Sequence, residues 1–173
     1  MKPYLISKAP AIMVWALLLF IIPTQAQFSQ ARLQATGLTC ALCSKAIHES
    51  LLQLPFVVSV RPELKTSSFL IQFKKGSRIG VRDLRTSVEE AGFFIWALTM
   101  ELAHTFSDSE RIANRFQVYG NSYKFLEKWT DGSTVQVIEK GFLSDKDFKK
   151  MAARYPGQMK DSGIVLFLLP VKK

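Results

Sequence analysis

Two cysteines, Cys40 and Cys43, are the only thiols in this 173-residue chain, and their spacing is C-x-x-C. Two thiolates at the start of a helix can converge on one soft metal ion, because the helix dipole and its unpaired N–H groups favour the ionised thiol. The same spacing occurs in thiol–disulfide redox sites and as half of a four-ligand zinc site. The sequence around the pair must therefore decide between these kinds of site.

The segments on either side of the cysteines predict a strand followed by a helix. Leu33 and Ala35 alternate with Arg32 and Gln34, which is the period of a half-buried strand, and Gly37 ends this pattern. After the cysteines, three apolar residues recur at helical spacing on one face before a proline ends the helix: Ile47, Leu51 and Leu54, then Pro55. The cysteines thus lie at a turn from strand to helix.

Four further segments of regular structure follow. Valines predict a second strand at 57–60, a polar connection follows at 62–67, and alternating Phe and Ile residues predict a third strand at 69–73, so these two strands form a hairpin. Apolar residues at helical spacing predict a second helix at about 79–91, with a glycine as its stop signal. Alternation at 95–102 predicts the fourth strand.

The order of these elements, βαββαβ, predicts an α+β fold of the ferredoxin-like class. In that arrangement both helices cover one face of a four-stranded antiparallel sheet. The cysteines are then expected at an exposed end of the two-layer sandwich.

Three short segments resemble the heavy-metal-associated domain family. Gly37–Cys43 reads Gly-Leu-Thr-Cys-Ala-Leu-Cys and is similar to that family's G-M-T-C-x-x-C loop. Val57–Val60 resembles its second strand, and Val88–Phe93 resembles the end of its second helix. The resemblance covers about residues 29–102. It implies periplasmic mercury-binding proteins and bacterial copper chaperones as the functional models, with Cys40 and Cys43 as the metal ligands.

The chain departs from the family pattern at two positions. Leu38 stands where the family usually has methionine, a core residue beneath the loop, and leucine of similar volume is expected to keep this support. Phe93 replaces the commoner tyrosine, which removes a hydroxyl near the site. Neither departure is expected to remove the site.

Ligand chemistry favours Cu(I) as the bound ion. Two soft thiolates suit Cu(I), which accepts two-coordination, whereas structural zinc needs four ligands. Hg(II) and Cd(II) would also bind, and Zn(II) alone would bind incompletely. His48 lies about 140° round the helix from Cys43 and is expected on the surface. His104, at the end of the fourth strand, is not expected to reach the cysteines.

The amino-terminal residues predict export. Lys2 and Lys8 flank the start of an apolar run from Ala11 to Ile22, and small residues suited to cleavage follow at 23–26. The run is shorter than the roughly 20 residues of a membrane span. We therefore expect residues 1–26 to be a cleaved signal peptide, a mature protein that begins near Gln27 without a membrane anchor, and a periplasmic or secreted location.

The formal net charge of +9 becomes +7 once the two lysines of residues 1–26 are removed (9 − 2). This charge favours acidic partners, among them an acidic metal donor or acceptor protein, although a solvated basic exterior is the simpler explanation. The chain carries no arginine-rich run and no helix-turn-helix pattern. Nucleic acid is therefore not expected as a partner.

Past His104 the resemblance ends, and residues 105–173 predict a second small α+β module of unknown function. Strands at 116–119, 123–129 and 135–138 suggest a three-stranded meander. A capping box that begins at Ser144 predicts a helix, and 164–169 reads as a buried closing strand. With residues 28–103 as the metal domain, the sequence predicts two modules after the signal peptide.

The sequence as a whole predicts an exported soft-metal-binding protein, a Cu(I) carrier or scavenger, and not an enzyme. Two alternatives remain open. In an oxidising compartment the cysteines could form a disulfide, which would serve thiol–disulfide redox chemistry rather than stability because the closed loop is small. Alternatively, the second module could recognise an envelope partner, with the metal as a switch.

Overall fold

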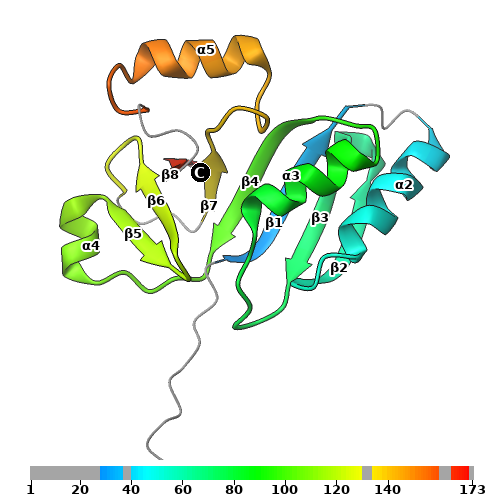
Figure 1. The fold of residues 1–173 in the computed structure, drawn as a ribbon, viewed down its shortest axis with the longest axis horizontal. Coiled ribbons are helices and arrows are strands. Elements are labelled where there is room, and N and C mark those ends of the chain that lie inside the picture. Colours follow the sequence, from blue (N-terminus) through cyan, green and yellow to red (C-terminus); the bar gives the residue numbers. More distant parts are fainter. Residues whose placement is uncertain (1–27, 37–39, 130–133, 160–164, 172–173) are drawn as a thin grey trace, which may run out of the picture.

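The computed structural model describes residues 28–36, 40–129, 134–159 and 165–171. These residues form one eight-stranded mixed sheet with helices packed on it (Figure 1). The strands of the first half are β1 (Phe28–Ala35), β2 (Val57–Glu63), β3 (Ser68–Phe73) and β4 (Ile95–Leu102), in the order β2-β3-β1-β4 and all antiparallel. The predicted ferredoxin-like arrangement is confirmed.

The helices α2 (Ala41–Leu52) and α3 (Val81–Glu90) lie side by side over this half of the sheet (Figure 1). Four apolar residues of these helices are fully buried, as the periodicity predicted: Ile47, Leu51, Leu84 and Val88. Leu54, which was expected on the same helical face, lies beyond the end of α2 and is only partly buried. The helices approach closely at two small residues, Ser50 and Ser87. The Ser50 hydroxyl donates to the Ser87 carbonyl oxygen at 2.7 Å. The predicted polar connection differs in detail: β2 continues to Glu63, and a short 3-10 helix, η2 (Leu64–Thr66), leads into β3.

The second half contains β5 (Arg115–Val118), β6 (Asn121–Phe125), β7 (Thr134–Val137) and β8 (Val165–Pro170). The order β7-β8-β6-β5 shows that the predicted meander is wrong. β5 and β6 form the expected hairpin, but β8 lies between β6 and β7 and is parallel to β6. The physical reason is that Val165–Leu168 is apolar on both faces and buried on both, which favours an interior position in the sheet.

Two capped helices accompany these strands. α4 (Asp108–Ala113) begins in a capping box in which the Ser107 hydroxyl accepts from the Glu110 backbone N–H and the Glu110 carboxylate accepts from the Ser107 N–H. α5 (Asp145–Arg154) has the predicted cap, since Ser144 Oγ accepts from the Asp147 N–H at 3.1 Å. Each cap satisfies an N–H group that a helix terminus otherwise leaves without a partner.

The two halves share one sheet and one core. β4 pairs with β7, with Met100 opposite Val135 in the register. The Phe28 ring meets Tyr123 edge-on at 5.6 Å, and both side chains belong to a buried cluster that runs through both halves. Independent folding of residues 28–103 stays a prediction. A fragment without residues 105–173 would expose the edge of β4 that pairs with β7.

A polar clasp also ties α3 to the segment between β7 and α5. Arg82 Nε and Nη2 donate to Glu139 Oε1 at 3.0 and 2.9 Å, and Glu139 is only 5% exposed. Arg85 Nη1 donates to the Lys140 carbonyl oxygen at 2.9 Å. Gly141, at φ +90°, leaves the room that the Arg85 side chain occupies, because a Cβ there would lie 2.6 Å from Arg85 Cδ.

The proposed signal peptide at residues 1–26 lies outside the described residues, as do Leu38 and the start of the closing strand at Ile164. Within the described ranges, no helix has the length and apolar character needed to cross a membrane.

Candidate metal-binding site

The candidate site lies where β1 ends and α2 begins. Thr36 follows β1 and Phe94 precedes β4. The Thr36 N–H donates a hydrogen bond to the Phe94 carbonyl oxygen at 2.8 Å, which holds the two strands together at this end. Cys40 is the N-cap of α2, with extended backbone angles (φ −124°, ψ 147°), and its carbonyl oxygen accepts from the Ser44 N–H at 3.1 Å. Both predicted ligands are therefore placed by the first turn of one helix.

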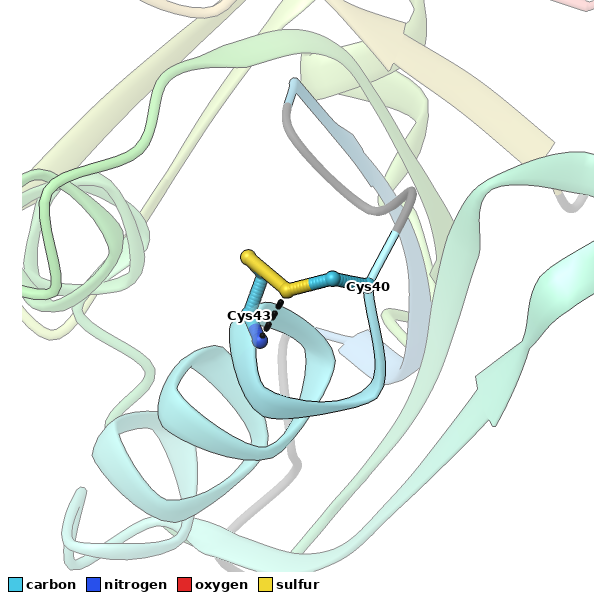
Figure 2. Close-up of a disulfide and its surroundings, with 2 residues drawn as sticks. All are labelled: Cys40 and Cys43. Carbon is cyan, nitrogen blue, oxygen red and sulfur yellow. Dashed lines mark hydrogen bonds between the residues drawn. A yellow bond between two sulfur atoms is a disulfide. The ribbon is translucent and has the colours of Figure 1, made fainter.

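Figure 2 shows that the two cysteines converge, with their sulfur atoms joined as a disulfide. Their Cα atoms are 5.3 Å apart, and the Cys43 N–H donates to Cys40 Sγ at 3.0 Å. Cys40 is exposed and Cys43 is half-buried. The pair can be reached from solvent, as the sequence predicted.

The electrostatic setting favours ionised thiols once the pair is reduced. The N-terminus of α2 carries the positive end of the helix dipole, and no acidic residue lies in the first turn to offset it. Lys45 is exposed and faces Glu49 at 3.7 Å, one turn further along α2. Because Glu49 offsets the charge of Lys45, the N-terminus of α2 is the source of positive potential beside the cysteines.

The two histidines do not join the cysteines. His48 is half-buried on α2. His104 lies at the junction of the two halves, where its Nε2 is 3.2 Å from Glu110 Oε1 and its ring stacks on Phe116 at 5.0 Å. Among the described residues, no group of three or more His, Cys, Asp or Glu side chains is arranged to hold a metal ion. The donor set in this part of the chain is the thiol pair, which fits an ion that accepts two sulfur ligands and not a four-ligand zinc site.

Three large apolar side chains in α2 and at the start of β4 are exposed, a feature that sequence reasoning missed. Leu42 is 79% exposed, Phe94 66% and Trp96 44%. Phe94 and Trp96 also line a groove of about 760 Å³, whose other wall includes Lys140 and Leu143 from the second half. The alternation pattern of β4 placed Trp96 on the face opposite Ile95, but no local signal indicated that a distant segment would form the facing wall.

Phe93 and Met100 are both packed in the first half of the fold. Phe93 is partly buried and packs against the core at the end of α3, and Met100 is 1% exposed within β4. On α5, Met151 packs with Tyr155 on a second buried cluster that includes Phe167, while Phe148 is half-buried.

Comparison with known proteins gives matches over the first half of the chain. Residues 32–94 match the family described as heavy-metal-associated domain. A comparison with curated protein sequences gave no match.

Among solved structures, the chain is similar to a CopZ metallochaperone (24% identity, TM-score 0.36, covering 39% of this chain and 98% of that one). It is also similar to a copper-binding domain from a P-type ATPase (25% identity, TM-score 0.36, 40% and 96% covered). A third neighbour is a yeast copper transporter domain (21% identity, TM-score 0.35, 39% and 90% covered).

Proposed function

We propose that this chain, in which residues 32–94 form a heavy-metal-associated domain, carries a soft metal ion on the thiolates of Cys40 and Cys43. The observation that supports this most directly is the convergence of the two sulfur atoms at the exposed N-terminus of α2. Both ligands come from one turn of helix, so chelation needs no rearrangement of the sheet. The protein acts as a carrier or scavenger and not as an enzyme.

Cu(I) is the proposed cargo. It is a soft ion that is stable with two thiolate ligands, and the described residues offer no third side chain to complete a zinc site. Hg(II) and Cd(II) share this preference for sulfur. Loading requires the reduced pair, so a dithiol must first supply two electrons to the Cys40–Cys43 bond and is itself oxidised to a disulfide.

Metal transfer would proceed through ligand exchange at the exposed loop. An incoming thiolate of a donor or acceptor protein adds to the metal to give a three-coordinate intermediate, and one of the two original thiolates then leaves. The ion passes between proteins without entering free solution. The exposure of Cys40 supports this route, because the attacking thiolate needs access from solvent.

We also propose that the protein is exported, with residues 1–26 removed as a signal peptide. The support comes from the sequence alone, from the short apolar run and the small residues before Gln27. Intact-mass analysis of the secreted or periplasmic protein should give a chain that starts near Gln27. Recovery of residues 1–26 in a membrane fraction would contradict this proposal.

The binding test uses the reduced mature chain (27–173) with Cu(I), measured by native mass spectrometry and by competition with a chelator. We expect one Cu(I) per chain, or one shared between two chains. Replacing Cys40 and Cys43 with serine should weaken binding by at least about a hundredfold, because the soft thiolate ligands and their chelation are lost. His48→Ala, on the same helix, should change little. A double serine variant that competes as well as the parent would place the site elsewhere.

The disulfide supports a second candidate, a thiol–disulfide redox protein. Cys40 is exposed at the N-terminus of α2, where the helix dipole stabilises a thiolate, which favours its departure in thiol–disulfide exchange. Reaction of the oxidised chain with a dithiol of known potential distinguishes the two functions. A redox protein exchanges rapidly and turns over with a substrate disulfide, whereas a metal carrier shows tight Cu(I) binding without such turnover.

A further inference from the structure

We propose that a pocket at the end of the sheet opposite the cysteines binds a neutral ligand rich in hydroxyl groups, that is, a saccharide. The pocket, called the bulge pocket below, has a volume of about 610 Å³, and its lining includes Ser29, Gln30, Val58, Gln72, Lys75 and Glu101. It lies where β1 begins, whereas the cysteines follow the end of β1 (Figure 1). β1 has 8 residues, so about 25 Å of strand separates the two ends. The site is separate from the proposed metal function.

Two β-bulges shape the bulge pocket. The register of β1 against β4 skips Ser29, which is an extra residue between Phe28 and Gln30. The register of β2 against β3 likewise skips Val58. A bulge redirects the side chain of its extra residue, and bulges are frequent next to active sites. Both extra residues line this one pocket, so two strands depart from regular pairing where the pocket forms.

The polar groups of the bulge pocket are held in place by one another. Gln30 Nε2 donates to Glu101 Oε2 at 2.6 Å, and Ser29 Oγ donates to the same oxygen at 3.3 Å. Neither bond uses Glu101 Oε1. Ser59 Oγ donates to Gln72 Oε1 at 3.0 Å, which leaves the NH₂ group of this amide as a donor. The pocket therefore offers a carboxylate oxygen and an amide N–H group to a ligand.

Charge and polarity narrow the class of ligand. Glu101 and Lys75 give the lining one charge of each sign, so a ligand with a net charge gains little attraction from it. An apolar ligand would remove the Glu101 carboxylate from water without giving it a new hydrogen bond, which costs free energy. The ligand that fits is therefore neutral and carries both donors and acceptors.

Hydroxyl groups meet these requirements best. A hydroxyl can donate to Glu101 Oε1 and accept from Lys75 or from an amide N–H at the same time. Val58 is 60% exposed and adds an apolar surface that suits the C–H face of a sugar ring. A peptide strand fits less well, because β2 is an edge strand whose bulge at Val58 interrupts the regular pairing that strand addition needs.

The experiment titrates the ¹⁵N-labelled mature chain (27–173), with its disulfide intact, with the neutral disaccharide N,N′-diacetylchitobiose. Amide chemical shifts report where the disaccharide binds. We expect saturable shifts at Ser29, Val58 and Gln72 and none at Cys43, which lies at the other end of the sheet. The disaccharide is raised to about 20 mM, which fills most of a site whose Kd is about 2 mM.

Two substitutions test the polar groups of the bulge pocket. Glu101→Gln keeps the size of the side chain but removes the ionised acceptor, so affinity should fall at least about tenfold, as for a hydrogen bond to a charged group. Gln72→Ala, at an exposed position, should lower affinity about three- to tenfold. Glu63→Gln is the matched control, because Glu63 is also a half-buried carboxylate but lies outside the lining, and it should stay within about twofold of the parent.

Three results would overturn the saccharide site. The first is a titration without saturable shifts at the bulge pocket, and the second is parental affinity in both Glu101→Gln and Gln72→Ala. The third is equal binding of N-acetyl-trialanine amide, a neutral peptide, which would show that the pocket does not select hydroxyl groups. If Glu101→Gln fails to give a folded spectrum, Gln72→Ala decides. All of these readouts are independent of metal binding.

Discussion

The two ends of the first half differ sharply in how they are stabilised. At the cysteine end the side chains are open to solvent, and three hydrogen bonds between Thr36 and Phe94 hold the strands together. At the junction with the second half, His104 and Phe106 are packed among the aromatic rings of Phe116 and Trp129. The comparison predicts that the junction contributes more to stability than the cysteine end does.

The largest expected effect tests the aromatic junction. Phe116 is 2% exposed and stacks on Tyr123 at 4.7 Å, so Phe116→Ala should lower the free energy of unfolding by about 3–5 kcal/mol through lost packing and a residual cavity. Urea unfolding measures this loss. Ile112→Ala, at an 88% exposed position, is the control and should change stability by less than about 0.5 kcal/mol. Equal losses would mean that the junction is not where stability lies.

The next effect concerns the clasp between α3 and the second half. Glu139→Gln keeps the size of the side chain but removes the charge that faces Arg82, and we expect a loss of about 1–3 kcal/mol, less than for a fully buried pair because Arg82 is one-third exposed. Glu49→Gln removes an exposed partner of Lys45 and should cost less than about 0.5 kcal/mol. Thermal unfolding of both variants sharpens the contrast between buried and exposed ion pairs.

A smaller effect is expected at the metal site when the second half is removed. The fragment 28–103 should fold and bind Cu(I) with an affinity within about tenfold of the mature chain, or 1.4 kcal/mol, because both ligands and their supporting helices lie inside it. Its stability should fall, since β4 loses its pairing with β7. A fragment without cooperative unfolding and without Cu(I) binding would show that the two halves form a single folding unit.

The smallest effect is a pH dependence at the junction. Burial opposes ionisation of Glu110, but hydrogen bonds from Ser107 and His104 outweigh it and lower the pKa of this carboxyl below its usual value. A lowered pKa in the folded state contributes stability above the unfolded pKa, and this contribution is lost as the pH falls through the folded pKa. Glu110→Gln keeps an oxygen that can accept from the Ser107 N–H but removes the negative charge at the start of α4, so it should cost about 0.5–1 kcal/mol at pH 7 and less below pH 4. Urea titrations at pH 7 and pH 3.5 test this, and an equal loss at both would contradict it.

The first half could be predicted from the sequence because its signals are local. Alternation in β1 and β3 and helical spacing in α3 each fix one element, and the βαββαβ order leaves few ways to arrange them. The C-x-x-C motif likewise identified Cys40 and Cys43 without any knowledge of the fold. The structure joins these two residues in a disulfide, and their role as metal ligands stays a prediction.

The second half could not be predicted to the same extent because its pairing is non-local. Val165–Leu168 was expected to be buried, but nothing in this short apolar run states that β6 and β7 lie on its two sides. The same holds at the candidate site, where Thr36 meets Phe94 across 58 positions of sequence. Local patterns report burial, whereas the choice between distant partners is decided by the assembled sheet.

The position of β8 has a consequence for how the protein is made. β5, β6 and β7 precede β8 in the chain, yet β8 is the strand that joins β6 to β7. Before β8 pairs, the β5–β6 hairpin has no strand that connects it to the rest of the sheet. The edge of β7 that β8 covers is then free to pair with other chains. The first half needs no such wait, since its strands pair with one another. We therefore expect a folding chain to pass through a stage in which the first half is formed and the second half is still prone to aggregation.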